Sequence, residues 1–335
     1  MIDSLATAIR WEWFKLARRW MPWILLAVLL LMSQLAVWGT IFAYRSLESS
    51  GGSVVVSGGP GRPPLGANCR DVLAGDTRKL PSGSSPQVIA GLQAQCRQEQ
   101  SQLSRQLQSE YDGIALPGSI PGALNLAVTV DLILLGVLTA SLFGAEYGWG
   151  TVRPNLVRGI GRWQYVTAKL ALLALVAAGS LLVVVAATAV SSVAARFVAP
   201  PPDQFAATTT WATAASALLK AWTGVIPFIA FAGFVTLLTR STAAGMAIAI
   251  GYRLGEGIIV TILGSVFTWF GTVSHYLLGP NIEAWAGLSF PGEGGQPAVG
   301  AVHAAVVLLA YTSVLLAASL YLFETRDVTS ASGGG

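Results

Sequence analysis

Long apolar runs separated by short polar segments dominate the hydrophobic pattern of this chain. A helix needs about 20 mostly apolar residues to cross a bilayer, and six runs meet this length. We therefore predict six transmembrane helices, over residues 21–44, 123–145, 164–194, 215–238, 242–267 and 298–323. The first run is too long for the apolar core of a cleavable signal peptide, so we expect it to be retained as a membrane helix.

Two other segments have a pattern that suits the membrane surface rather than a span. In residues 1–20 an apolar residue recurs every three or four positions, which predicts an interfacial amphipathic helix; its stripe is Ile2, Leu5, Ile9, Trp13, Leu16 and Trp20. Residues 268–297 are aromatic but are interrupted by Gly271, Gly279 and Pro280. That region is too short to cross twice, so we predict external interfacial or re-entrant helices.

Composition supports a lipid environment. Charged residues make up only 11% of the 335 residues and hydrophobic residues 53%, whereas soluble domains carry roughly 25% charged residues. The formal net charge is +4, and the basic residues form no patch with interleaved aromatic residues, so nucleic acid is not an expected partner. The predicted fold class is all-α and integral to the membrane.

The distribution of Lys and Arg predicts the orientation. Basic residues concentrate in the segments 1–20 and 146–163, Arg240 lies between the fourth and fifth spans, and the tail 324–335 contains Arg326. By the positive-inside rule these segments face the cytoplasm. Both termini are therefore expected on the cytoplasmic side of the cell (inner) membrane. The long polar segment 45–122 is then an external loop or cap.

The external loop contains both cysteines of the chain. From Pro86 to Glu110 its apolar residues keep helical spacing on one face, which predicts a helix. Cys69 and Cys96 form an even pair confined to the non-cytoplasmic side, and this predicts a structural disulfide. Two unpaired buried thiols are the alternative interpretation.

Several catalytic and nucleotide-binding motifs are absent from the sequence. It contains no phosphate-binding G-x-x-x-x-G-K-[ST] loop, no H-E-x-x-H, no G-x-S-x-G and no Cys/His cluster. We therefore expect no enzymatic activity, no metal site and no cofactor in this chain.

The segment between the second and third predicted spans carries the most informative motif. It reads Glu146-x-x-x-Gly150-Thr151-x-Arg153 and continues through Leu156 and Arg158 to Arg162. Gly150 and Thr151 suit a turn and a helix N-cap, and glycines after Arg158 end the short helix that this predicts. Basic residues at this position would equally serve as a simple positive-inside anchor.

This motif, the six spans and the stretch from Glu12 to Lys15 that precedes the first of them resemble the permease subunits of ABC-2 type ABC transporters. The resemblance implies an exporter in which two permease copies, identical or closely homologous, pair with two separate ATPase subunits that bind ATP and Mg. It also implies that the short cytoplasmic helix docks on the ATPase. The ATPase-coupling residues would be Glu146, Gly150, Thr151, Arg153, Leu156, Arg158 and Arg162.

Three charged residues fall inside predicted spans, where charge is costly and usually faces protein or water. Arg253 and Glu256 are three residues apart on one helix and can offset each other, and Asp131 could reach Arg253 in a bundle. They either line a substrate path or form a structural ion pair. Gly251 and Gly255 form a G-x-x-x-G pattern that favours close packing against another helix or a second copy.

Two other functions fit the same sequence. The chain could be an ion- or proton-coupled secondary transporter that uses Asp131, Arg253 and Glu256, although the two halves of the sequence show no convincing repeat. It could also be a membrane anchor or sensor that does not transport, although six helices with buried charge exceed what an anchor needs.

Overall fold

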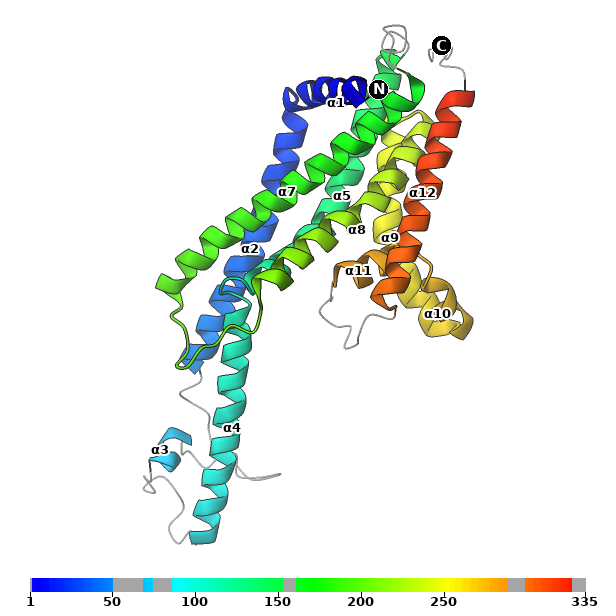
Figure 1. Cartoon of the computed structure of the whole chain (residues 1–335). Helices are drawn as coiled ribbons and strands as arrows, with labels where there is room; N and C mark the ends of the chain where they lie inside the picture. Colours follow the sequence, from blue (N-terminus) through cyan, green and yellow to red (C-terminus); the bar gives the residue numbers. More distant parts are fainter. Residues whose placement is uncertain (1, 51–68, 75–85, 153–160, 288–298, 327–335) are drawn as a thin grey trace. The chain divides into compact units, whose positions relative to one another are not determined.

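The computed structural model describes residues 2–50, 69–74, 86–152, 161–287 and 299–326 (Figure 1). This part of the chain contains α-helices and no strands, so the predicted all-α class is confirmed. The helices are α1 (Ile2–Ala17), α2 (Trp20–Ser50), α3 (Cys69–Leu73), α4 (Pro86–Asp112), α5 (Ser119–Gly148), α7 (Arg162–Val198), α8 (Trp211–Thr239), α9 (Thr242–Val266), α10 (Thr268–Ser274), α11 (Leu278–Ala286) and α12 (Ala301–Thr325).

Six of the described helices are long and apolar enough to cross a membrane: α2, α5, α7, α8, α9 and α12. This agrees with the six spans expected from the sequence. These helices differ in how deeply they are buried within the chain. In the most apolar 18-residue stretch of each helix, 61% of the residues of α5 and 67% of those of α8 are buried, against 11% for α9 and 17% for α12. The large apolar side chains left exposed on the outer helices suit contact with lipid, the solvent for an apolar surface in a bilayer.

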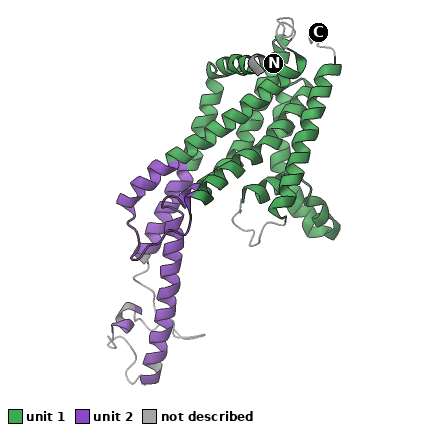
Figure 2. Cartoon of the chain, viewed as in Figure 1, with its two compact units in different colours: residues 1–33, 121–187, 212–335 green, residues 34–120, 188–211 purple. Residues whose placement is uncertain are grey.

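The chain forms two compact units (Figure 2). Unit 1 comprises residues 1–33, 121–187 and 212–335, and unit 2 comprises residues 34–120 and 188–211. In unit 1, α1, the end of α5, the start of α7 and the end of α12 lie at one end, and α10 and α11 lie at the other (Figure 1).

The core of unit 1 is built where small residues let helices approach closely. A Cβ on Gly136 of α5 would meet the ring of Phe228 from α8 and the methyl group of Ala249 from α9 at 3.2 and 3.3 Å. Gly144 of α5 lies against Thr242 of α9 in the same way. Close approach increases the dispersion contacts that hold apolar helices together where lipid supplies no hydrophobic driving force.

Unit 2 is held by aromatic and polar contacts around the end of α4. The ring of Tyr111 lies 5.4 Å from that of Tyr44 and 4.6 Å from that of Phe205. Beside it, the Asp112 carboxylate accepts hydrogen bonds from the Thr208 amide, at 3.1 Å, and from the hydroxyls of Thr208 and Thr209. These contacts tie the segment that precedes α8 to the end of α4.

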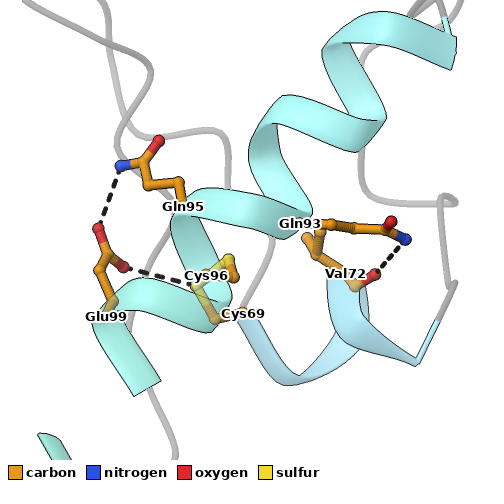
Figure 3. The surroundings of a disulfide bond; sticks show 6 residues. All are labelled: Cys69, Val72, Gln93, Gln95, Cys96 and Glu99. Atoms are coloured by element: carbon orange, nitrogen blue, oxygen red, sulfur yellow. Dashed lines mark hydrogen bonds between the residues drawn. A yellow bond between two sulfur atoms is a disulfide. The ribbon is translucent and has the colours of Figure 1, made fainter. Parts of the chain in front are cut away.

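The predicted disulfide is present between Cys69 of α3 and Cys96 of α4, with the Cα atoms 5.3 Å apart (Figure 3). Val72 packs against the disulfide, with Leu73, Ile89 and Leu92 around it. Gln93 of α4 donates a hydrogen bond to the Val72 carbonyl at 3.4 Å. Helix α4 also confirms the helix expected from Pro86 onward, and the disulfide fastens the five-residue helix α3 to it.

We predict that replacing both cysteines by serine releases α3 from α4. A cross-link between residues 27 apart in sequence removes chain entropy worth about 3–4 kcal/mol from the unfolded loop. Limited proteolysis read by mass spectrometry should therefore show faster cleavage within residues 69–96, with the membrane-spanning part unchanged. Gln102→Ala, at an exposed position of α4, is the control, and equal cleavage of the two variants would contradict the prediction.

Candidate functional site

Four charged side chains meet in unit 1 where α1, the end of α5 and the start of α7 come together. We call Glu12, Lys15, Glu146 and Lys169 the charge cluster. Lys169 lies 2.9 Å from Glu12 and 3.0 Å from Glu146, and Lys15 lies 2.6 and 3.4 Å from the same two carboxylates. Two acids and two bases alternate, so the formal charges of the cluster cancel.

Lys169 is the centre of the cluster, and its side chain is fully buried. An ammonium group has three N–H donors, and here they reach three acceptors: Glu12, Glu146 and, at 3.1 Å, the carbonyl of Leu142. The rings of Tyr165 and Phe143 lie 4.9 and 5.7 Å from the nitrogen, within cation–π distance. A buried ammonium is tolerated because it is both paired and fully hydrogen-bonded.

Glu146 belongs to the cluster through its side chain and to the end of α5 through its backbone. Gly150 has φ +65, a left-handed conformation that glycine adopts without strain. The Thr151 amide then donates to the Glu146 carbonyl at 3.0 Å, and the Gly150 amide to Tyr147 at 3.2 Å. This is the Schellman pattern that ends helices, so the spacing from Glu146 to Gly150 and Thr151 positions the carboxylate next to a fixed turn.

Helix α12 is joined to the same end of unit 1 through Arg162 and Tyr165 of α7. Arg162 donates to the carbonyl of Glu324 at 2.6 Å and to that of Phe323 at 3.5 Å, where the last carbonyls of a helix favour a cation. Tyr165 stacks on Phe323 at 5.0 Å and donates to Glu146 at 2.6 Å. The network therefore links α1, α5, α7 and α12.

Lys15 is the most accessible member of the cluster. Burial disfavours its ammonium form, but its hydrogen bond to Glu12 and the negative charge of Glu146 outweigh that effect, so the pKa of Lys15 lies above its ordinary value. Lys15 is thus a cation at neutral pH. The same arrangement turns the rings of Trp11 and Phe14 outward, with the guanidinium of Arg18 4.1 Å from the Phe14 ring.

The apolar stripe expected on α1 is divided in the structure. Leu16 is buried against the protein, whereas Trp13 is exposed. The helix expected over residues 1–20 ends at Ala17, so Trp20 is not on α1 but is the exposed first residue of α2. Glu12, which lies beside the expected stripe, is buried instead because Lys15 and Lys169 neutralise it.

The residues expected to couple to an ATPase are placed only in part. Glu146, Gly150 and Thr151 form the turn described above, and Arg162 is engaged with α12. Arg153, Leu156 and Arg158 lie outside the described residues.

The intramembrane charges of α9 have other partners than the sequence suggested. Arg253 and Glu256 do not bond to each other: Arg253 pairs with Glu283 of α11 at 3.2 Å. Glu256 accepts hydrogen bonds from the Gly279 amide at 2.9 and 3.0 Å and from Tyr252 at 2.7 Å. The reason is that α11 packs against this face of α9 and supplies both a carboxylate and the free amides of its first turn.

Asp131 also has a different neighbour than expected. It accepts a hydrogen bond from Ser180 of α7 at 3.2 Å, and among the described residues it forms no ion pair, so the expected approach to Arg253 is not found. Arg253 is instead paired with Glu283 of α11. Asp131 is only 3% exposed, so its carboxyl group is buried without a partner cation from the described residues.

The glycines expected to pack a helix against α9 have no neighbour in the described part of this chain. A Cβ on Gly251 or Gly255 would meet nothing within 4 Å. The glycine of α9 that does pack closely is Gly245, about two helical turns before Gly251. Gly245 lies against Thr236 of α8, and a Cβ on Gly245 would lie 3.2 Å from Ala140 of α5.

Sequence reasoning did not assign Glu12 and Lys169 to a site. The sequence does contain a signal, because an acid beside the apolar stripe of α1 and a lysine seven residues after the start of α7 are both costly unless they are paired. The sequence could not show that these two residues pair with each other, because they are 157 positions apart.

Comparison with known proteins adds a family but no function. Residues 111–329, well over half of the chain, match the family described as "Protein of unknown function (DUF2705)", so the chain belongs to this family. No curated protein and no solved structure matches the chain.

We predict that Lys169→Met destabilises the protein, because it leaves Glu12 and Glu146 buried with one partner cation fewer. Breaking a buried ion pair costs about 3–5 kcal/mol, which should lower the thermal unfolding midpoint by several degrees in nanodiscs. Adding Glu12→Gln restores the charge balance and should recover part of the loss. Lys220→Met, a lysine with no ion pair among the described residues, is the control. A double variant no more stable than Lys169→Met would contradict the pairing.

We predict that Gly279→Ala disrupts the contact between α9 and α11, because its Cβ would overlap the Glu256 carboxylate. Displacing a buried hydrogen-bonding group from its donor costs about 1–3 kcal/mol, so the thermal unfolding midpoint should fall. Gly271→Ala is the matched control, since a Cβ there meets nothing within 4 Å. The prediction fails if the two alanine variants unfold at the same temperature.

Proposed function

We propose that this chain is the membrane-spanning permease subunit of an ATP-driven exporter of the ABC-2 type, which couples ATP hydrolysis by a separate ATPase subunit to substrate translocation. The observation that carries the proposal is the charge cluster. It includes Glu146, the first residue of the motif from Glu146 to Arg153 on which the resemblance to ABC-2 permeases rests, and it connects that motif to α1 and α7. Arg162 and Tyr165 extend this connection to α12.

The cluster supplies the mechanical link that such a subunit needs. A soluble ATPase can act on a membrane bundle only through an element that is rigidly held by several spanning helices. Here Glu146 lies in the last turn of α5, and its carboxylate is bound by Lys169 and Tyr165 of α7. Displacement of the segment that follows Gly150 would therefore act on α5 and α7 together. Buried charge pairs resist separation because each partner left alone is costly.

The proposed orientation places this end of unit 1 in the cytoplasm of a cell with the chain in its cytoplasmic membrane. Six spans return the chain to the side on which it starts, and the basic segments 1–20 and 146–163 favour the cytoplasmic side. The disulfide in segment 45–122 is then outside, where an oxidising compartment lets such bonds persist. Two copies of the chain would pair with two ATPase subunits, and the Gly251–Gly255 face of α9, which no described residue covers, leaves room for a second copy.

Asp131 favours a second candidate, an ion- or proton-coupled transporter. It is a buried carboxylate without a partner cation among the described residues, and such groups mark ion pathways in many transporters. Arg253 and Glu256 support this candidate less, because both are engaged by α11. The two candidates differ in their energy source, ATP or an ion gradient.

The proposed function is tested by co-expressing this chain with an ATPase encoded beside it that carries a Walker A and an ABC signature motif. We predict that the two co-purify and that complex formation raises ATP hydrolysis severalfold. Arg153→Glu should reduce both association and stimulated hydrolysis at least tenfold, because it reverses a charge in the proposed docking segment. Arg105→Glu, at an exposed position of α4, should change neither. Unchanged association and hydrolysis in Arg153→Glu would refute the coupling role.

A further inference from the structure

A cavity of about 270 Å³ lies in unit 1, between α1, the first half of α2, α5 and α7. Leucine and valine side chains form most of its wall. Polar atoms come from few residues: the carboxylate of Asp131, the hydroxyl of Ser180 and the indoles of Trp13 and Trp23. Apolar walls with a few placed polar groups are the usual character of small-molecule sites.

The carboxylate in this cavity is incompletely satisfied. Asp131 accepts one hydrogen bond, from Ser180, whose hydroxyl also lies 2.9 Å from the carbonyl of Ala177. A carboxylate has two oxygens and about four acceptor positions. In the described part of the chain no ammonium or guanidinium group pairs with it, in contrast to Glu12, Glu146 and Glu283. The ionised form of this carboxyl group therefore has no counter-ion in the described part of the chain, and a cationic occupant of the cavity would supply one.

The opening, the volume and the aromatic side chains of the cavity indicate what kind of molecule would fit. Trp23 and Leu175, which line the cavity, are each more than half exposed, so the cavity opens on the apolar outer surface of unit 1. An apolar cavity of roughly 150 Å³ accommodates benzene, so about 270 Å³ suffices for a two-ring body. Trp indoles also attract cations through their ring faces.

We propose that this cavity binds a lipophilic ammonium compound, with the ammonium group on Asp131 and an aromatic body among the leucines. The cation offsets the buried carboxylate, and the apolar body replaces the lipid that would otherwise fill the opening. A neutral hydrophobe satisfies only the walls, and a small hydrated cation only the carboxylate. The site does not require an ATPase, so it stands or falls independently of the proposed function.

The test measures saturable binding of naphthylethylammonium to the full chain in nanodiscs, with protein-free nanodiscs as the background. The neutral analogue naphthylethanol has the same aromatic body without the charge. We expect one ammonium per chain, bound at least tenfold more tightly than the alcohol. Asp131→Asn should weaken ammonium binding at least tenfold and change alcohol binding less than twofold.

A second variant tests the cavity without touching the carboxylate. Gly179 lines the cavity, and a Cβ there meets nothing within 4 Å, so Gly179→Leu should fill the space and abolish binding of both compounds. Gly264→Leu is the matched control, since Gly264 of α9 also has open space and lies outside the cavity; it should bind as the wild type does. The thermal unfolding midpoint of each variant reports whether it is folded.

Three results would overturn the proposal. The first is unchanged ammonium binding in Asp131→Asn, which would remove the carboxylate from the site. The second is equal affinity for the alcohol and the ammonium, which would leave an apolar groove for lipid chains. The third is no saturable binding of either compound to the folded wild-type chain.

Discussion

The burial of the Lys169 ammonium between Glu12 and Glu146 is the constraint on which the arrangement of unit 1 depends. A lone charge inside a membrane protein is strongly unfavourable, so neither carboxylate nor the ammonium can be buried unless α1, α5 and α7 come together. The pairing therefore sets which face of α1 turns inward. It also fixes the end of α5, because Glu146 contributes its backbone carbonyl to the turn at Gly150.

Contacts made by Tyr165 and Arg162 of α7 connect helix α12 to the same network. Tyr165 connects Glu146 to α12 by a hydrogen bond and a ring stack, and Arg162 closes the end of α12. At the other end of unit 1, Glu256 and Arg253 of α9 hold α11 in an analogous way, through a helix N-terminus and an ion pair. Both ends of the unit thus use paired polar groups, while glycine contacts such as Gly136 and Gly144 supply the packing between them.

Asp131 stands apart from this scheme, since in the described chain it is a buried acid without a cation. Glu146 and Lys169 are paired with each other, and Arg253 and Glu256 are both engaged by α11. Among the acids inside the spans, this leaves Asp131 as the one most readily available to a ligand. The proposed coupling residues and the proposed ammonium site are therefore different groups: the first centre on Glu146 and Lys169, and the second on Asp131.

The sequence by itself determined the class of protein, the number of apolar helices and the disulfide. Each of these follows from local composition or from pairing of the only two cysteines, Cys69 and Cys96. The spacing from Glu146 to Thr151 also marked a turn that the structure contains. Only the tertiary structure decided the partners of the charges: Lys169 with Glu12, Arg253 with Glu283, and Asp131 with no cation in the described chain. The physical reason is that periodicity fixes which side of a helix is apolar, whereas a charge pair depends on how helices distant in sequence are rotated and shifted against each other.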